Sequence, residues 1–305
     1  MKKLIISVLI LLAIVTSFYG CRKNDNPKLP ENIETGVYPL FVQDTTGDFL
    51  IQEMDSFKTS FDVDLYFPNS VMPQKMDIVV VKKDSSQVED FGTVKLLKAD
   101  VTTFPTKISV TGPQLAQLFG MSTSQVKNST TFRIGADITL PNGKVLVAFQ
   151  QGVTGTDTLN LEPYGADALN LPNANPTITY PKVCPLFMDS LANVENGGDL
   201  VVDDPDFWED TYNVTATQEG SDVIVLTGWL GLPNAVVKVT IDERRQKASV
   251  AKQVYSSTLP TTPYHNPAVA GSGTVNACDN SITLSLENTV DEGSFGTVTV
   301  TVKRP

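Results

Sequence analysis

Residues 57–67, Phe57-Lys-Thr-Ser-Phe-Asp-Val-Asp-Leu-Tyr-Phe67, alternate apolar or small side chains with polar ones almost without a break. Successive side chains of a β-strand point to opposite faces, so this period of two indicates a strand with one buried and one solvated face. The stretch therefore predicts a half-buried β-sheet, and the segments that follow it continue the same pattern.

Five further segments are rich in β-branched and apolar residues: 76–81, 93–97, 107–111, 131–140 and 144–149. Pro141-Asn142-Gly143 separates the last two, and Asn-Gly between two such segments is a strong hairpin signal because both residues tolerate positive φ. One short helix is predicted over residues 113–119, with Pro113 in its first turn and Gly120 just beyond its end. About seven short strands in this span predict an immunoglobulin-like β-sandwich over residues 37–160.

A second series of strands follows a proline-rich segment. Residues 161–183 lack a sustained period and contain several prolines, which predicts a linker between domains. Beyond it, strand patterns separated by short polar turns occur at 211–217, 223–229, 236–241, 248–255, 273–277, 282–286 and 296–302. Short turns connect antiparallel neighbours, so residues 184–305 are predicted to form an up-and-down β-meander that curls towards a barrel. The predicted fold class is therefore all-β.

The 305-residue chain is acidic, with 34 Asp and Glu residues against 23 Lys and Arg residues and a formal net charge of −11. A nucleic-acid-binding protein normally carries a basic surface, so no nucleic-acid partner is expected. One histidine excludes any site that needs two, and three cysteines exclude a zinc site built from four thiolates. The sequence shows no assembled nucleophile, base or metal set, so it predicts no cofactor and no enzyme activity.

The N-terminus has the parts of an export signal. Met1-Lys2-Lys3 is basic, residues 4–15 are almost wholly apolar, and Cys21 follows soon afterwards. A helix of that apolar length spans about 18 Å, whereas a bilayer core is about 30 Å thick. Residues 1–20 are therefore predicted to be a cleaved signal peptide and residues 21–36 a flexible tether.

Phe18-Tyr19-Gly20-Cys21 resembles the lipobox of bacterial lipoproteins. This resemblance implies that Cys21 becomes the lipid-modified first residue of the mature chain, with acyl chains such as palmitate holding the protein to a membrane. The alternative is a plain signal peptide that ends near a cysteine.

The layout also resembles surface lipoproteins of the Bacteroidota. The segment Ile108-Ser-Val-Thr-Gly-Pro-Gln-Leu-Ala-Gln-Leu-Phe-Gly120, then Thr131-Phe-Arg-Ile-Gly-Ala-Asp-Ile-Thr139, is similar to the N-terminal domain of SusE-type glycan-uptake lipoproteins. The resemblance implies a location at the outer membrane, with a glycan or a surface uptake complex as partner. The surface-export signal of such proteins is an acidic run after the cysteine. Here Arg22 and Lys23 precede Asp25, so the cell surface and the periplasmic face both stay open.

Cys184 and Cys278 are the two cysteines that remain after lipidation of Cys21. Export places them where disulfides persist. A bridge would tie the start of the second domain to one of its last turns, and closing so long a loop is worth roughly 4–5 kcal/mol in the chain-entropy model. We predict this bridge; the alternative is two buried free thiols.

Asp203, Asp204 and Asp206 belong to a run of acidic residues, and hard oxygen ligands at close spacing suit Ca²⁺. The run lacks the D-x-D-x-D-G pattern and its turn glycine, so the alternative, a solvated acidic loop, is preferred.

His265 lies in a proline-rich loop, and the chain has no G-x-S-x-G elbow. His265 is therefore predicted to be a solvated loop residue and not a catalytic base.

Trp208, Tyr212 and Tyr264 are the candidate ligand-binding residues. Aromatic rings stack on the C–H faces of sugars, and neighbouring amides and carboxylates bind the sugar hydroxyls. Trp208 follows the acidic run and Tyr264 lies in a proline-rich loop, so exposure is expected for both, whereas Trp229 ends an apolar strand and belongs in the core. Packing inside the fold is the alternative for each of them.

These observations favour a lipid-anchored, non-enzymatic binding module that serves glycan capture or uptake at the outer membrane. The alternative is a structural or protein-interaction accessory lipoprotein of a surface complex. Two exposed aromatic residues in a groove would favour the first interpretation, and a flat apolar patch would favour the second.

Overall fold

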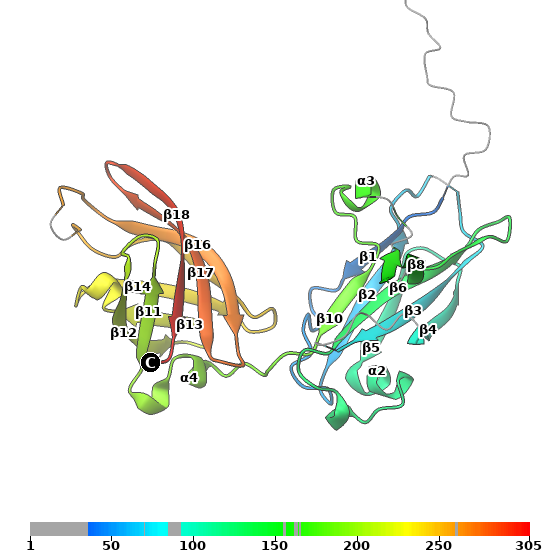
Figure 1. Cartoon of the computed structure of the whole chain (residues 1–305), viewed down its shortest axis with the longest axis horizontal. Helices are drawn as coiled ribbons and strands as arrows, with labels where there is room; N and C mark the ends of the chain where they lie inside the picture. Colours follow the sequence, from blue (N-terminus) through cyan, green and yellow to red (C-terminus); the bar gives the residue numbers. More distant parts are fainter. Residues whose placement is uncertain are drawn as a thin grey trace, which may run out of the picture. The chain divides into compact units, whose positions relative to one another are not determined.

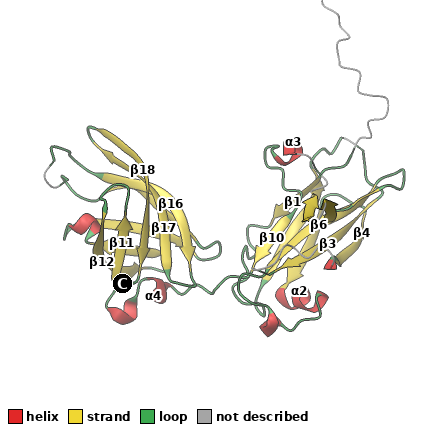
Figure 2. Cartoon of the chain, viewed as in Figure 1, coloured by secondary structure: helices red, strands yellow, loops and turns green. Residues whose placement is uncertain are grey.

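The computed structural model describes residues 36–69, 71–84, 93–154, 157–161, 164, 166–259 and 262–305. The predicted signal peptide, most of the predicted tether and Cys21 lie outside these residues. Strands dominate the described chain, with a few short helices between them (Figure 2). The all-β prediction is confirmed. None of the helices among the described residues is long and apolar enough to cross a membrane.

The first part of the chain contains two antiparallel sheets. One has the strand order β1 (Pro39–Gln43), β2 (Lys58–Leu65), β5 (Thr106–Thr111). The other has the order β10 (Ile178–Pro181), β6 (Thr131–Thr139), β3 (Lys75–Lys83), β4 (Lys95–Val101), and β7 (Val145–Leu146) also pairs with β6. A separate two-stranded ribbon is formed by β8 (Gln150–Thr154) and β9 (Asp157–Leu161).

The two larger sheets share one hydrophobic core, which makes this part a β-sandwich. On β2, every second side chain from Thr59 to Leu65 is buried, as the period of two predicts, whereas Phe67 lies beyond the strand and is exposed. Phe61 belongs to the same buried cluster as Phe132 and Ile134 of the other sheet. The hairpin at 141–143 is also confirmed, because β7 pairs back onto β6.

The short helices join strands or flank them. They are α2 (Gly112–Leu118), η2 (Thr123–Gln125), α3 (Ala166–Leu169), α4 (Met188–Leu191), η3 (Val194–Asn196) and η4 (Trp229–Gly231). In α2, the Thr111 hydroxyl accepts a hydrogen bond from the Gln114 amide and Pro113 occupies the first turn, which are typical features of a helix start. The helix predicted for this segment is therefore confirmed, one residue earlier than expected.

The prediction of a linker over residues 161–183 is wrong for its second half. β10 pairs with β6 from Ile178 to Pro181, and Tyr180 is almost completely buried in the sandwich core. β10 is the outermost strand of its sheet, and an edge strand tolerates proline because one side of its backbone needs no donor. The prolines that indicated a linker are thus compatible with an edge strand.

The second part of the chain is an eight-stranded antiparallel barrel in which each strand pairs with its neighbours in sequence (Figure 1). The strands are β11 (Asp199–Asp204), β12 (Asp210–Glu219), β13 (Val223–Thr227), β14 (Val236–Asp242), β15 (Lys247–Val254), β16 (Ala268–Asn276), β17 (Ser281–Val290) and β18 (Gly293–Lys303). The predicted meander is confirmed, and it closes completely.

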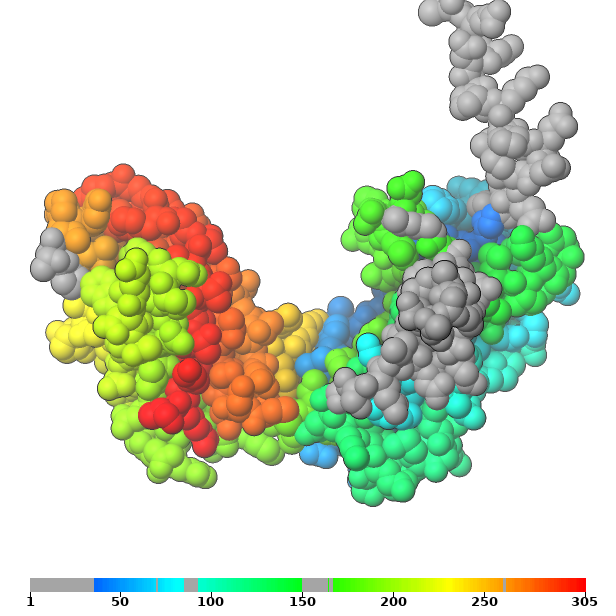
Figure 3. Space-filling model, viewed as in Figure 1, coloured from blue at the N-terminus to red at the C-terminus, as the bar shows by residue number. Residues whose placement is uncertain are grey.

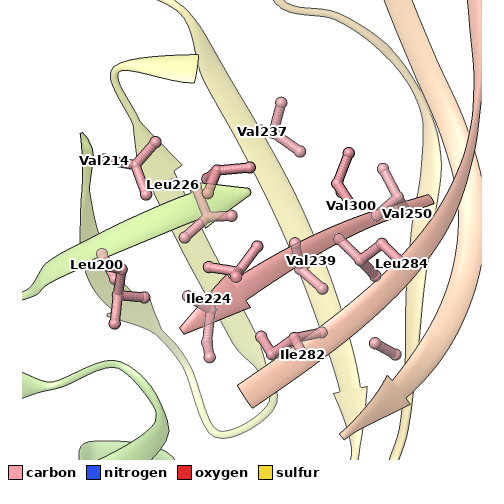
Figure 4. Packing of buried hydrophobic residues seen from close by; sticks show 14 of the residues in the cluster. Leu200, Val214, Ile224, Leu226, Val237, Val239, Val250, Ile282, Leu284 and Val300 are labelled. Carbon is pink, nitrogen blue, oxygen red and sulfur yellow. The ribbon is translucent and has the colours of Figure 1, made fainter. Parts of the chain in front are cut away.

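Inward-facing side chains from all eight strands fill the barrel. Figure 4 shows Leu200, Val214, Leu226, Val237 and Leu284 pointing towards one another from different strands. Closely packed side chains inside a barrel of eight strands form a core and leave no pore. The alternation of these residues with polar outward residues is the reason that the strands could be predicted.

The seam of the barrel contains a strand that the sequence analysis missed. A solvated acidic loop is the structure preferred for the run that contains Asp203 and Asp204, but these two residues lie in β11, which pairs with β12 on one side and with β18 on the other. Leu200 and Val202 point inward while Asp199 and Asp203 point outward. The contact between the first and last barrel strands is visible where the red atoms of β18 lie beside the yellow-green atoms of β11 (Figure 3).

Cys184 and Cys278 form a disulfide, with 5.2 Å between their Cα atoms. The predicted bridge is thus confirmed. Cys184 packs against the barrel core, and its carbonyl accepts a hydrogen bond of 2.7 Å from the Gln246 side chain. The bridge fixes the segment that enters the barrel to the turn between β16 and β17.

Candidate functional site

One end of the barrel gathers most of its aromatic residues. Strands of an up-and-down barrel alternate in direction, so every second connection lies at the same end. The connections at this end are residues 205–209, 228–235, 255–267 and 291–292, of which 260 and 261 lie outside the described residues. We call this the aromatic end of the barrel.

Three separate segments bring their rings together on the surface of this end. The Phe207 and Phe295 ring centroids lie 5.4 Å apart, and those of Tyr264 and Phe295 lie 5.1 Å apart in an edge-to-face arrangement. Phe295 is 41% exposed, and Trp208, next to Phe207, is 37% exposed. The Phe207–Trp208–Tyr264–Phe295 group is called the aromatic rim below. Phe207 and Tyr264 are half-buried against the barrel core, and Trp208 and Phe295 are the exposed rings that a ligand can contact.

Polar side chains flank the rim. His265 Nδ1 lies 2.6 Å from Glu292 Oε1, and the His265 amide donates a 3.0 Å hydrogen bond to Glu292 Oε2. The Asn266 side-chain amide donates a 2.7 Å hydrogen bond to Asp291 Oδ2. These contacts fix the loop that carries Tyr264 to the turn that precedes Phe295. His265 is an exposed loop residue, as predicted.

We expect His265 to titrate above its ordinary pKa of 6.5, because the Glu292 carboxylate accepts a hydrogen bond from the imidazolium and attracts its charge. A raised pKa means that the pair stabilises the fold below about pH 6.5 and loses this effect as the pH rises through the pKa of the folded state. The measurement is an NMR titration of the single histidine. Glu292→Gln should bring the midpoint back towards 6.5, and an unchanged midpoint would show that Glu292 is not the cause.

Beneath the rim, polar side chains are buried inside the barrel. Asp204 is 2% exposed, and its Oδ1 accepts a 3.0 Å hydrogen bond from the Phe207 amide, which holds the loop that carries Phe207 and Trp208. Burial raises the pKa of Asp204 above its ordinary value, although the hydrogen bonds from the Phe207 and Trp208 amides lower it. Burial and the Asp204 charge also raise the pKa values of Tyr212 and Tyr255.

The 228–235 connection inserts its η4 turn into the barrel core. Trp229 and Leu230 are buried, and the Trp229 ring meets the Tyr212 ring edge-to-face at 5.8 Å. Leu230 has a φ of 54° in the left-handed region, which is costly for a residue with a branched side chain. The barrel interior is therefore filled at this end, and the accessible rings are those of the aromatic rim.

Tyr212→Phe tests the buried Tyr212 hydroxyl. The nearby Leu230 amide lowers the pKa of this hydroxyl, but no described group makes a hydrogen bond of normal geometry with it. A buried polar atom without a partner costs about 1–3 kcal/mol. We therefore expect Tyr212→Phe to leave the free energy of unfolding unchanged or to raise it by about 1 kcal/mol, measured by urea denaturation. The free energy of unfolding of Tyr255→Phe is measured for comparison. If Tyr212→Phe lowers the free energy of unfolding by more than about 1 kcal/mol, the Tyr212 hydroxyl makes a hydrogen bond that this geometry lacks.

The aromatic residues named from the sequence fall into two places. Trp208 is exposed at the aromatic rim, as predicted, whereas Tyr264 lies there half-buried against the barrel core. Tyr212 points into the core, where it cannot contact a ligand on the surface. Phe207 and Phe295 were missed, although an aromatic residue beside an exposed polar turn is a signal that the sequence contains. Trp229 is in the core, as predicted.

The aspartates considered for Ca²⁺ do not converge. Asp204 points into the barrel, while Asp203 points outward and lies 3.9 Å from Lys303. Across the part of the chain that the structure describes, no three His, Cys, Asp or Glu side chains form a group that could hold a metal ion.

No protein-family model matches this chain, and no curated protein matches it in sequence. The similarity of residues 108–120 and 131–139 to SusE-type lipoproteins therefore stays a prediction.

Proposed function

We propose that this chain is a lipid-anchored, non-enzymatic binding module that captures a glycan at the outer membrane through the aromatic rim. The observation that carries the proposal is that the exposed Phe295 ring contacts the rings of Phe207 and Tyr264, while Trp208, the chain neighbour of Phe207, is also exposed. These residues come from two connections and the start of β18, so the barrel itself sets the spacing of the rings.

The chemistry of the rim suits a sugar. Ring faces provide apolar area for C–H groups at a low entropic cost, while carboxylates and an amide accept and donate hydrogen bonds to hydroxyls. Glu292, Asp291 and Asn266 stand beside the rim. The connections at this end contain no Lys or Arg, so the surrounding charge is negative and a neutral glycan is favoured over an anionic one.

The non-enzymatic part of the proposal has support from the groups that could act as nucleophile or base. Cys184 and Cys278 are joined to each other, and His265 is paired with Glu292 at the surface. A base in a nucleophilic site needs to reach the nucleophile that it activates. These residues are instead used in the structure of the barrel.

The test is a glycan-array screen of the protein, followed by titration with any neutral glycan that binds. We expect Trp208→Ala and Phe295→Ala each to weaken binding by about tenfold or more, since stacking on an aromatic ring is worth on the order of 1–2 kcal/mol. Phe67→Ala is the matched control, because Phe67 is 48% exposed but lies in the sandwich. Binding to no glycan, or equal loss with all three variants, would refute the role of the rim.

The membrane location is tested separately. We expect Cys21→Ser to release the protein from the membrane fraction, because the acidic chain provides no electrostatic attraction to anionic lipid that could replace the acyl chains. Fractionation and immunoblotting measure this. A variant that stays in the membrane fraction would contradict lipid anchoring through Cys21.

A second candidate function is that of an accessory subunit in a surface complex. The observation in its favour is that β4 stands at one edge of its sheet in the described strand order, and its residue Leu96 is 53% exposed. An edge strand with an exposed apolar side chain can pair with a strand of another protein. Photo-crosslinking from position 96 in the membrane fraction would give one discrete product if this edge is an interface, and none otherwise.

A further inference from the structure

The outer wall of the barrel carries a groove that is separate from the aromatic rim. It has a volume of about 310 Å³, and its floor is the outward face of β11, β12 and β13. Asp199 stands opposite Thr215 in the register of β11 and β12, and Thr215 stands opposite Thr227 in the register of β12 and β13. The three side chains thus form a row across three strands, and Asn213 adds a fourth polar group on the same face of β12.

The wall of the groove comes from the η4 connection. Gly228 and Gly231 line it. Gly228 has a φ of 96°, and a Cβ atom there would lie 3.3 Å from the Asn213 carbonyl oxygen. A glycine at this position lets the connection leave β13 close against β12, which places a rigid backbone wall beside the polar floor.

The polar groups of the floor are not used within the protein. No hydrogen bond joins the side chain of Asp199, Asn213, Thr215 or Thr227 to another described residue. Outward threonines on a barrel commonly face water, but here four free polar groups converge in a concave site. Its volume is at the lower end of the roughly 300–1,000 Å³ typical of small-molecule sites.

We propose that this groove is a binding site for a neutral, hydroxyl-rich ligand of about the size of a monosaccharide. Two hydroxyls and an amide can each donate and accept hydrogen bonds, and the Asp199 carboxylate is a strong acceptor for a ligand hydroxyl. The lining contains no basic side chain, so an anionic ligand would meet Asp199 without compensation. With one carboxylate only, the floor also lacks the several oxygen charges that would favour a metal ion.

The site stands independently of the proposed function, because it shares no residue with the aromatic rim. The test is an NMR titration of the protein with D-glucose, with D-glucuronate as an anionic analogue of the same ring. We expect D-glucose to shift the backbone amides of residues 213–215 and 227–231 in a saturable way, and D-glucuronate to bind at least fivefold more weakly. Asp199→Asn should remove most of this difference, because it removes the charge and keeps the shape.

Thr215→Val removes one hydroxyl, keeps the branched shape that strands favour, and should weaken D-glucose binding roughly five- to tenfold. Thr217→Val is the matched control, since Thr217 is the next outward residue of β12 and does not line the groove. Three outcomes would overturn the proposal. They are the absence of saturable shifts in the groove, equal effects of Thr215→Val and Thr217→Val, and preferential binding of ethanolamine, a cationic probe. Shifts confined to residues 207, 208, 264 and 295 would overturn it while supporting the aromatic rim.

Discussion

Trp229→Ala is expected to lower the free energy of unfolding of the barrel by about 3–5 kcal/mol, the range for removing a large aromatic side chain from a packed core. Trp229 is 2% exposed and packs edge-to-face on Tyr212 in the barrel core. Its removal would leave a cavity that the neighbouring strands cannot fill, because hydrogen bonds to both neighbours fix each strand in position. The measurement is urea denaturation followed by tryptophan fluorescence.

The matched control is Trp208→Ala. The chain contains two tryptophans, both in the barrel, so each single variant keeps one fluorophore that reports the unfolding of the barrel. Trp208 is 37% exposed at the aromatic rim, and its replacement should cost much less, on the order of 1 kcal/mol or below. Similar losses for both variants would mean that Trp229 is not the core residue that the structure shows.

Removing the disulfide is expected to cost about 2–5 kcal/mol of barrel stability. Cys184 and Cys278 are 94 positions apart, so the bridge closes the segment that contains β11 to β16 into one covalent loop. Without the disulfide, the unfolded chain gains conformational entropy, whereas the eight strands keep their pairing in the folded state. We therefore expect Cys184→Ala with Cys278→Ala to lower the urea midpoint of the tryptophan signal.

Reductant provides the control for this prediction. Dithiothreitol should lower the midpoint of the wild-type barrel to near that of the double variant and leave the double variant unchanged. If dithiothreitol also lowers the midpoint of the double variant, the shift of the wild-type midpoint has a cause other than this disulfide. A wild-type midpoint that reductant does not change, with complete reduction verified by thiol labelling, would show that the bridge contributes little to stability.

Most strands could be predicted because every second residue in the middle of the strand is apolar. In β12, inward apolar residues alternate with outward polar ones over residues 211–217, and in β17 they do so over residues 281–287. This period is visible without any knowledge of neighbouring strands. The disulfide could be predicted for a different reason. Only one pair of cysteines remains after Cys21, and an exported chain can keep that pair oxidised.

β11 and β10 could not be predicted, because their own residues carry too little of the signal. β11 has only Leu200 and Val202 as inward apolar residues, with an inward Asp204 and outward aspartates. Its conformation depends on the open edges of β12 and β18, which need a partner for their backbone groups. β10 depends in the same way on β6, since a four-residue strand that ends in proline has little preference of its own.

The candidate site could also be predicted only in part. Trp208 and Tyr264 could be singled out as aromatic residues in polar or proline-rich connections, but their separation in sequence says nothing about their distance in space. Ring contacts with Phe295 bring the two loops together, and the burial of Tyr212 removes it from the surface. The groove at Asp199, Thr215 and Thr227 has no local signal at all, because it arises from strand register.

By itself, the sequence determined the all-β class, the order of most strands and the cysteine pairing, since each depends on local periodicity, composition or a residue count. The tertiary structure alone decided the closure of the barrel, the incorporation of β10 and β11, and which polar and aromatic side chains meet. The physical reason is that a β-strand satisfies its backbone hydrogen bonds through other strands. Its neighbours, its register and the groups that it places side by side are therefore properties of the whole sheet.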